Sequence, residues 1–524
     1  MRPGYEADTN MPTQGILDVT EKIFNDPVHG AISLHPLCVK LVDTPQFQRL
    51  RNLKQLGSTY FVYPAAAHNR FEHCLGVCHL AGQLVCALQS RQPDLNISPE
   101  DVLCVQLAGL CHDLGHGPFS HLWEDFVTRA RPDKNWTHED ASVRMFDYLI
   151  EENNLHEYFR MYNLHERDLL FIKELIRGPK IINGATWPYE GRNRSKGFLY
   201  EIVANKRSGI DVDKWDYFLR DGHSLGIEVK FDYQRLIKFS RVINVEDEGP
   251  QICFRDKEVD SLYHMFYTRR ALHKTAYQHR VVKTIDSMLI DAFLYADKQI
   301  QYRGSNGRKY YLGDVCDDMS AYTYLSDDVF GTILRAEGDH PDLLSAQQIL
   351  RNILTRKLYS YIGQTYPTSG SMDKNTLMTL LAFKIPPGSS LTRDQLEIHE
   401  LRLNYGMGDK NPIEKVRFFS KHNPQVAKVL RKEEVSYMLP QSFQEVVFRL
   451  VVKNGDESVL QVAQEMFRET CSELNMKAPS IAMRPTHLTP VKCKSPISHE
   501  NGSSEMNNSA VRVQSKDLYF SSSP

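Results

Sequence analysis

The chain has 524 residues, of which 41% are hydrophobic and 24% charged, enough apolar material for one large helical body or for two or three domains. Its formal net charge of −2 gives no overall signal of nucleic-acid binding. No apolar run approaches the roughly 20 residues that span a bilayer, and the polar start MRPGYEADTN is not a signal peptide. We therefore expect no membrane partner and a location inside the cell.

The ten cysteines include no CxxC pair, and most of them lie in apolar helical segments. Such cysteines are typical of buried free thiols in a reducing compartment, not of a disulfide framework or a zinc ribbon.

Residues 1–20 are predicted to be a flexible leader. Turns imposed by proline and glycine follow in IFNDPVHGAISLHP, and DTPQFQRLRNLKQLG then has the apolar spacing of a helix. Thr44 is a good helix N-cap, because Pro45 suits the first helical position. The next segment, HNRFEHCLGVCHLAGQLVCAL, predicts a long apolar helix that carries His73 near its start.

The stretch LAGLCHDLGHGPFSH places His112 and Asp113 at the end of an apolar helix. Burying an imidazole and a carboxylate is costly unless they are paired or bind a metal, so this position indicates ligands. Gly115, Gly117 and Pro118 then break the helix, which leaves His116 and His121 near the same place.

Two later segments carry further polar candidates. In WTHEDASVRMFDYLI, Thr137 is a predicted N-cap and His138 stands at the helix start. In SGIDVDKWDYFLRDGHSLGI, we interpret Asp211 and Asp216 as parts of a solvated acidic face, whereas Asp213, between Val212 and Trp215, is the better ligand candidate.

The C-terminal half mixes predicted strands and helices. Residues 240–258 read as two short strands about a Gly-Pro turn, and residues 300–313 as a hairpin around Asn306-Gly307. VRFFS (416–420) is strand-like, and FQEVVFRLVV (443–452) is predicted to be helical. From Leu474 onward Ser, Asn, Pro and Lys dominate, which predicts a disordered tail.

The polar anomalies form an ordered set, His73, His112, Asp113 and Asp213. Two imidazoles and two carboxylates from separate helices suit a transition metal, with room for water and a harder second ion. Such a centre supports phosphate-ester hydrolysis, because metals lower the pKa of water and neutralise phosphoryl oxygens. His116, His121 and His138 then remain to bind phosphate or to protonate a leaving oxygen.

The ordered H…HD…D pattern resembles the HD-domain phosphohydrolase superfamily. Nine motifs in order resemble the vertebrate deoxynucleoside triphosphate triphosphohydrolase that joins an HD domain to an N-terminal SAM domain: NDPVHG, DTPQFQRLR, NRFEHCLGV, HDLGHGPFSH, WTHE, GIDVDKWDY, FDYQRLIKF, RDKEV and YQHR. The resemblance runs from about residue 23 to about residue 470. Only some twenty residues precede this region, so we expect no SAM domain and no basic nuclear-import cluster there, in contrast to that family.

The resemblance implies hydrolysis of a dNTP to deoxynucleoside and inorganic triphosphate, by attack on the α-phosphorus. It places iron, zinc or a similar metal on the four ligands, with Mg²⁺ bridging to the phosphates. His121 would protonate the 5′-oxygen, while His116 and His138 would face the α-phosphate.

The same resemblance assigns the substrate contacts. The triphosphate would be held by Arg70, Lys214, Tyr217, Arg269, His279 and Arg280, beside His116 and His121. Gln55 and Asp221 would bind the 3′-hydroxyl. Leu56 and Tyr277 would pack against C2′, so that ribonucleotides are rejected.

Relatives of this kind assemble into tetramers on binding nucleotides between subunits. The site for GTP or dGTP would use Lys22, Ile23, Asp43, Gln48 and Arg51, with Arg356 from a neighbouring subunit. The second site, for a dNTP, would use Asn25, Val62, Arg235, Arg255, Lys257 and Lys421. The pattern implies Asn at position 261 and Lys at position 360, and this sequence has Ser261 and Ser360 instead.

Short motifs indicate further partners. Thr489-Pro490-Val491-Lys492 fits a cyclin-dependent kinase site, and Arg356-Lys357-Leu358 fits a cyclin-docking motif. The resemblance further implies a nuclear location, with the cytoplasm as the alternative, and roles in limiting dNTP pools, antiviral defence, innate immunity, and DNA replication and repair.

Two other functions stay open. A different HD enzyme, a nucleotidase or a phosphodiesterase, needs the ligands but not the basic triphosphate contacts. A protein that binds single-stranded nucleic acid through interface Arg and Lys would survive loss of the ligands and would weaken steeply with salt.

The predicted fold is mainly α. It comprises the leader 1–20, an HD core over 21–290, a smaller α+β C-terminal lobe over 291–472 for regulation and oligomerisation, and the disordered tail 473–524.

Overall fold

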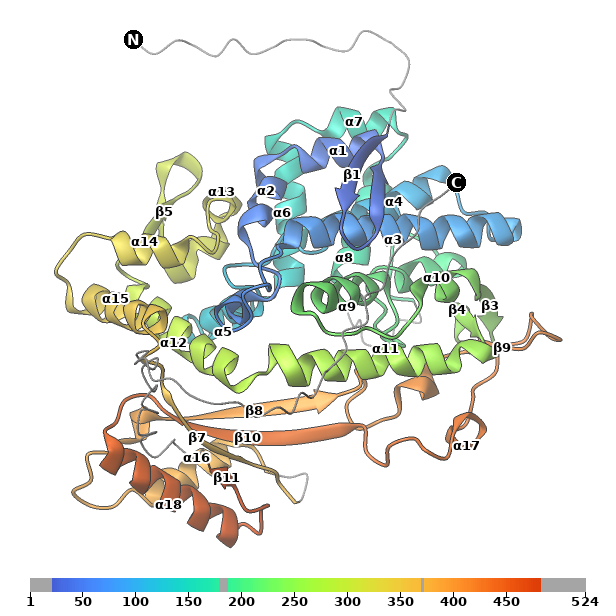
Figure 1. Ribbon diagram of the computed structural model, residues 1–524. Coiled ribbons are helices and arrows are strands. Elements are labelled where there is room, and N and C mark those ends of the chain that lie inside the picture. The colour runs from blue at the N-terminus through green and yellow to red at the C-terminus, as the bar shows by residue number, and fades with distance from the viewer. Residues whose placement is uncertain (1–20, 179–186, 369–371, 482–524) are drawn as a thin grey trace, which may run out of the picture. The chain divides into compact units, whose positions relative to one another are not determined.

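The computed structural model describes residues 21–178, 187–368 and 372–481. Helices dominate it, which confirms the mainly α class (Figure 1). The α-helices up to Leu225 are α1 (Pro36–Val42), α2 (Pro45–Gln48), α3 (Arg70–Arg91), α4 (Pro99–Cys111), α5 (His121–Ala130), α6 (His138–Glu152), α7 (His156–Met161), α8 (Glu166–Arg177) and α9 (Val212–Leu225). Those that follow are α10 (Tyr233–Lys238), α11 (Val259–Leu272), α12 (Arg280–Ala296), α13 (Met319–Thr323), α14 (Val329–Arg335), α15 (Pro341–Leu354), α16 (Lys374–Phe383), α17 (Lys432–Val435) and α18 (Glu457–Glu473).

Helix α3 is the central helix of the core, and it packs against both α4 and α9. By length and composition alone it is apolar enough to cross a membrane, but 72% of its apolar window is buried inside the protein. It is therefore a core helix. The free cysteines that the structure describes are also buried, except Cys86, as their apolar context predicts.

The predicted helix caps are confirmed. The Thr44 hydroxyl accepts a hydrogen bond from the Phe47 amide at 3.4 Å, and Pro45 opens α2. The Thr137 hydroxyl accepts one from the Asp140 amide at 3.2 Å, so α6 begins at His138. These caps fix where the two helices start.

In the described residues the strands form four small sheets. They are β1 (Lys22–Asp26), β2 (Gly30–Leu34), β3 (Ser240–Val245), β4 (Gly249–Arg255), β5 (Gln301–Arg303), β6 (Lys309–Tyr311), β7 (Ser360–Thr365), β8 (Leu396–Asn404), β9 (Phe418–Phe419), β10 (Gln444–Val452) and β11 (Ser480–Ile481). The sheet orders are β1-β2, β3-β4-β9, β5-β6 and β11-β7-β10-β8.

The prediction of a helix over residues 443–452 is wrong, because this segment is β10, an inner strand between β7 and β8. Its valines, among them Val447 and Val452, are β-branched and favour a strand that is packed on its neighbours. Helices α16 and α18 share one apolar core with this sheet. The lobe also extends beyond the predicted boundary, since β11 pairs with β7 in a region that we assigned to the tail.

The two predicted hairpins are present. In the first, the turn is formed by residues 246–248, and Gly249-Pro250 already belongs to β4, where Pro250 lies opposite Asn244. The second, β5-β6, has Asn306 at its tip with a positive φ of 54°. The predicted strand at 416–420 is β9, which runs parallel to β4 and thus joins the β3-β4 sheet.

A partly buried histidine on β8, His399, makes stability depend on pH. His399 Nε2 lies 2.9 Å from the Ser287 hydroxyl of α12, and burial lowers the His399 pKa to about 4, which Glu397 only partly opposes. Because the unfolded chain binds this proton near pH 6.5, the stabilisation is present above that pH and is lost as pH falls toward 4.

We expect the free energy of unfolding to drop between pH 7.5 and pH 5, with His399 contributing about 2 kcal/mol of that drop. Urea titrations at the two pH values should therefore show a smaller drop in His399→Gln than in the wild type. His340→Gln is the control, because that side chain is 54% exposed. An equal drop in all three proteins would contradict the assignment.

Candidate active site and metal centre

Four predicted ligands meet at one point from three helices. His73 lies in the first turn of α3, His112 caps the C-terminus of α4 with Asp113 beside it, and Asp213 lies in the first turn of α9. Asp213 Oδ1 is 3.2 Å from His73 Nε2 and 3.4 Å from His112 Nε2. The Asp113 carboxylate oxygens lie 3.5 Å and 3.4 Å from the same two nitrogens.

The donor set fits a metal. His73 Nε2 and His112 Nε2 are both buried without a hydrogen-bond partner among the described residues, which is costly unless another group binds them. Ligands bonded to one metal at about 2.0–2.2 Å lie roughly 3–3.5 Å apart, and these donors have that spacing. His73, His112 and Asp213 thus already form a metal-binding geometry, with Asp113 alongside.

The carboxylates also control the charge of these histidines. Burial alone would lower the pKa of His73, but the carboxylates of Asp213 and Asp216 beside its two ring nitrogens outweigh it and raise that pKa to about 10. The pKa of Asp213 falls below its usual range, because His112 and His73 outweigh the effect of burial. A bound cation would replace the protons that these histidines otherwise hold.

The interpretation of Asp211 and Asp216 as a solvated face is wrong. Asp211 is 1% exposed, and its carboxylate caps α9 by accepting the Lys214 amide. Asp216 is fully buried, and its Oδ2 lies 2.7 Å from His73 Nδ1. Asp216 therefore orients His73 from the side opposite the ligand nitrogen, a role that carboxylates often have behind metal-binding histidines.

A buried ion-pair network holds Asp216 itself. Its Oδ1 lies 2.7 Å from His29 Nε2 and 2.9 Å from the Arg220 guanidinium, which also pairs with Asp26 of β1 at 2.8 Å. The network needs a glycine at position 76 of α3, since a Cβ there would overlap the Asp216 carboxylate.

Asp216→Asn should weaken metal binding about 10–100-fold while the four ligands stay intact. The amide keeps the shape of the side chain but not the charge that fixes the His73 ring. Metal titration of the stripped protein measures this change. Asp328→Asn, whose side chain is 70% exposed, is the control, and equal affinity in the two variants would remove the positioning role.

The remaining three histidines cluster beside the ligands. The His116 and His138 rings stack with centroids 4.1 Å apart, and the His121 ring lies edge-on to both, at 5.1 Å and 5.3 Å. His116 Nε2 also lies 3.3 Å from Asp113 Oδ1. The α4–α5 turn approaches α6 this closely because Gly115 has no Cβ, which would overlap the Ser142 amide and the His138 carbonyl.

The three histidines of this cluster differ in their pKa values, their hydrogen-bond partners and their exposure to the cavity. Burial, Arg70 and His138 lower the pKa of His116 far below its usual range and that of His121 to about 4. His138 Nδ1, in contrast, lies 3.2 Å from the Glu124 carboxylate of α5. The His121 ring faces the open cavity, whereas His116 is buried.

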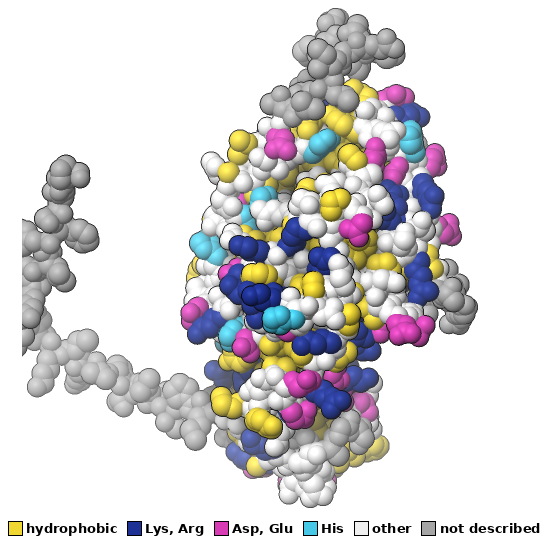
Figure 2. Space-filling view, turned by 90° about the vertical axis from the view of Figure 1, so that its right-hand side faces the viewer, with side chains coloured by type: hydrophobic (Ala, Val, Ile, Leu, Met, Phe, Trp, Pro, Cys, Tyr) yellow, Lys and Arg dark blue, Asp and Glu magenta, His cyan; other side chains and the backbone are white. Residues whose placement is uncertain are grey.

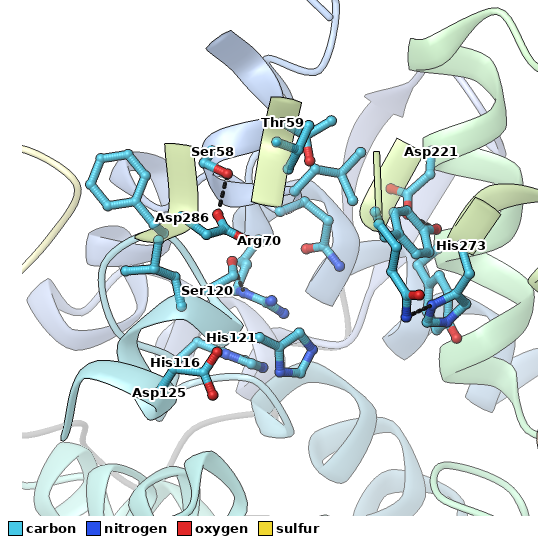
Figure 3. Close-up of a pocket in the computed structure, with 18 of the residues that line it drawn as sticks. Ser58, Thr59, Arg70, His116, Ser120, His121, Asp125, Asp221, His273 and Asp286 are labelled. Carbon is cyan, nitrogen blue, oxygen red and sulfur yellow. Dashed lines mark hydrogen bonds between the residues drawn. The ribbon is translucent and has the colours of Figure 1, made fainter. Parts of the chain in front are cut away.

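The cluster opens into a cavity of about 380 Å³, shown in Figure 3. Arg70 lies at its centre, where its guanidinium pairs with Asp113 and donates to the Ser120 hydroxyl at 3.0 Å. Asp221 lies to one side, held by the Tyr277 hydroxyl and by His68 Nε2 at 2.7 Å. The structure thus brings together the following predicted substrate contacts: Gln55, Leu56, Arg70, His116, His121, Tyr217, Asp221 and Tyr277.

Four other predicted triphosphate contacts are not among the described cavity-lining residues. Lys214 Nζ pairs with Asp211 at 2.7 Å, and Arg269 donates to the Asn404 carbonyl at 2.8 Å. His279 caps α12, and Arg280 lies over the Tyr361 ring.

Several polar residues at the cavity were not predicted from the sequence. They are Glu124 behind His138 and, on the cavity wall, Ser58, Asp125, His273, Gln278, Lys283 and Asp286. His273 and Tyr277 bound a π-helical turn between α11 and α12, an irregularity that often occurs at functional sites. The role of Asp216, which was interpreted from the sequence as solvated, had a usable signal, because Asp216 follows Asp213 by about one helical turn.

The residues assigned to the GTP site lie on neighbouring elements near β1. Lys22 lies 3.9 Å from Asp43, Arg51 donates to Gln48 at 2.7 Å, and Ile23 is 66% exposed. Arg356 lies elsewhere, donating to the Phe61 carbonyl next to Val62.

The residues assigned to the second nucleotide site lie mostly around β3 and β4. Arg235 and Lys257 both lie over the Phe239 ring, and Arg255 pairs with Asp256. Figure 2, which views the β3-β4 side, shows Lys and Arg side chains gathered near the middle of that face. Thr489, the predicted phosphorylation site, lies outside the described residues.

Comparison with known proteins now identifies the class. The model of the HD domain matches residues 70–197, which include His73, His112, Asp113 and the histidine cluster. Three of the four candidate ligands, His73, His112 and Asp113, thus lie in an HD domain, and Asp213 follows it in the chain.

Whole-chain relatives narrow this class. The bovine deoxynucleoside triphosphate triphosphohydrolase SAMHD1 is 48% identical over 478 residues, covering 89% of this chain and 81% of that protein. The human protein of the same name is 48% identical over 88% of this chain and 75% of its own length. The Dictyostelium discoideum homologue is 34% identical over 92% and 86%. The chain belongs to the SAMHD1 family of deoxynucleoside triphosphate triphosphohydrolases.

Proposed function

We propose that this protein hydrolyses deoxynucleoside triphosphates to deoxynucleoside and inorganic triphosphate. The observation that carries the proposal is the pair of unpartnered, buried Nε2 atoms of His73 and His112, set beside a cavity with three further histidines. The names of the relatives give the substrate class.

In this reaction water adds to the α-phosphorus, and the bond from that phosphorus to the 5′-oxygen breaks. His73, His112, Asp113 and Asp213 would hold a divalent transition metal, with iron and zinc as the candidates and Mg²⁺ on the phosphates. Such metals lower the pKa of water and neutralise charge on phosphoryl oxygens.

The side chains of the cavity do the remaining work. Arg70 lines the cavity and is held there by Asp113 and Ser120, so its guanidinium would act as a fixed donor to the phosphates, a group of about four negative charges. His121 donates a proton to the leaving 5′-oxygen, since its ring faces the cavity. His138, held by Glu124, and His116 bind the α-phosphate. The negative charge of the substrate opposes the effect of burial, Arg70 and His138 on the pKa of His121, and so favours the protonated form of this acid.

The deoxyribose would bind to the part of the cavity wall that carries Gln55, Leu56, Asp221 and Tyr277. The Asp221 carboxylate would accept a hydrogen bond from the 3′-hydroxyl, and Gln55 would form a second hydrogen bond with this hydroxyl. The buried Gln55 Oε1 has no partner among the described residues. Leu56 and Tyr277 close the space at C2′, so a 2′-hydroxyl would be crowded and unpaired.

Regulation is part of the proposal. GTP or dGTP at the Lys22–Arg51 surface, completed by Arg356 of a neighbouring subunit, and a dNTP near β3-β4 would assemble a homotetramer. Ser261 and Ser360 are expected to alter the activator preference. We place the enzyme in the nucleus, limiting dNTP pools in antiviral defence and DNA replication and repair.

The test is product analysis with dATP, with and without GTP, in Mg²⁺ buffer. Deoxyadenosine and intact triphosphate should appear when GTP is present and should be lost in the double variant His112→Ala/Asp113→Ala. Orthophosphate or pyrophosphate would indicate a different HD hydrolase. No turnover by metal-loaded tetramer would favour a nucleic-acid binding protein.

A further inference from the structure

The turn that leads into α5 has a strained backbone. Phe119 and Ser120 both have a positive φ, of 57° and 62°, which residues that carry a Cβ rarely adopt. Both residues are buried. The turn ends at His121, the first residue of α5, which lines the cavity (Figure 3). Such a backbone persists only where the surrounding contacts hold it in place.

One side chain from the C-terminal half of the chain holds this turn. Asp327 lies between α13 and α14, and its Oδ1 accepts a hydrogen bond from the Phe119 amide at 2.7 Å. Its Oδ2 accepts one from the Lys54 amide at 2.8 Å. The Ser120 hydroxyl also donates to the Lys54 carbonyl at 2.6 Å. One carboxylate thus fixes two backbone amides from segments that are far apart in the sequence.

The Asp327 carboxylate is ionised at neutral pH. Burial raises the pKa of Asp327 to about 6, and the two backbone amides, Lys54 and Arg49 limit that increase. The ionised form has an acceptor oxygen for each amide, whereas Asn at this position would turn its NH₂ group toward one of the two donors. Both hydrogen bonds therefore need the carboxylate.

Two more contacts from the same part of the chain hold the start of the α4–α5 turn. The Tyr322 hydroxyl donates to the Gly115 carbonyl at 2.9 Å. The buried Arg49 guanidinium donates to the Leu325 carbonyl and to the His116 carbonyl, each at 2.7 Å, and so links the two segments. The turn is therefore held at both of its ends.

The proposed general acid depends on this turn more than other cavity residues do. The His121 ring contacts two other rings edge-on, but it makes no hydrogen bond or ion pair with any residue that the structure describes. Arg70, in contrast, pairs with Asp113, and the Gln55 amide donates to the His68 carbonyl at 3.0 Å. The start of α5 therefore sets the position of His121.

We propose that residues 322–327, here called the brace, position the general acid His121, and that Asp327 is the main positioning residue. The brace acts through the Phe119–Ser120 turn and keeps His121 within reach of the leaving 5′-oxygen. No residue of the brace is among the described residues that line the cavity. This inference rests on the proposed function, since it takes His121 as the acid.

The test is a double-mutant cycle with His121, measured as kcat under saturating activator. Asp327→Asn should lower kcat about 10–100-fold, because a displacement of about 1 Å at a reacting group has an effect of that size. In the His121→Gln background the same substitution should change kcat by less than about threefold, because no acid is left to misplace. Asp327→Asn would lower both rates by the same factor if Asp327 only stabilised the fold, and that result would overturn the proposal.

Two further variants sharpen the test. Asp328→Asn is the matched control, since this neighbouring side chain is 70% exposed, and it should leave kcat unchanged in both backgrounds. Tyr322→Phe removes only one hydroxyl and keeps the ring that fills the core, so it should fold even if Asp327→Asn does not. It should lower kcat about 3–10-fold, and only where His121 is present. Equal losses in both backgrounds would overturn the proposal.

Failure of the proposed function would look different, because the wild type would then release triphosphate from no dNTP. Amide hydrogen exchange tests the brace without turnover. Peptides over residues 114–121 should exchange about 2–10-fold faster in Asp327→Asn than in Asp328→Asn, since the Phe119 amide loses its fixed acceptor. Equal exchange in the two variants would overturn the proposal independently.

Discussion

Asp213→Asn should abolish both metal binding and turnover, with kcat/KM falling by at least about 1,000-fold, because a metal supplies several kcal/mol of transition-state stabilisation. The amide has the same shape as the carboxylate but removes the charge that faces both ligand histidines, 3.2 Å and 3.4 Å away. Metal content by mass spectrometry and triphosphate release measure the two losses.

The fold should survive this change. Asp213 lies in the first turn of α9, and the substitution leaves the N-cap of this helix, the hydrogen bond from the Lys214 amide to Asp211, unchanged. Circular dichroism of Asp213→Asn should match the wild type, and Asp328→Asn should keep full metal content and activity. A metal-loaded, active Asp213→Asn protein would refute the ligand assignment.

His121→Gln should lower kcat by about 10²–10⁴-fold, the usual contribution of a general acid, while metal content stays unchanged. His121 is chosen because its ring faces the cavity, whereas His116 is buried and bonded to Asp113. The measurement is the rate of deoxynucleoside release under saturating activator.

A substrate whose leaving group needs no proton distinguishes a general-acid role of His121 from a structural role. In a substrate with sulfur in place of the 5′-oxygen, the deoxynucleoside leaves as a thiolate. It needs no proton from an acid, because a thiol has a pKa near 8.5. His121→Gln should therefore lose little activity on this substrate, whereas His138→Asn should lose activity on both. Equal losses of His121→Gln on both substrates would move the acid role elsewhere.

The ligand set was predictable from sequence for a physical reason. His73 and His112 lie in sequence segments that are predicted to be apolar, buried helices. A buried imidazole is costly unless it has a hydrogen-bond partner or binds a metal. The caps at Thr44 and Thr137 were predictable as well, because capping depends on local chemistry alone.

Features that depend on tertiary packing were not predictable in the same way. Asp216 was misread because helical spacing places it on a face without saying whether that face is buried. Residues 443–452 were misread because an apolar run reads alike as a buried helix or an inner strand.

The central claim is that the metal centre cleaves the bond between the α-phosphorus and the 5′-oxygen of a dNTP. Hydrolysis of dATP in water enriched in ¹⁸O, with GTP present, tests it directly. The account predicts intact triphosphate carrying one ¹⁸O atom and deoxyadenosine carrying none. Label in the 5′-hydroxyl of deoxyadenosine, or in orthophosphate or pyrophosphate, would contradict it.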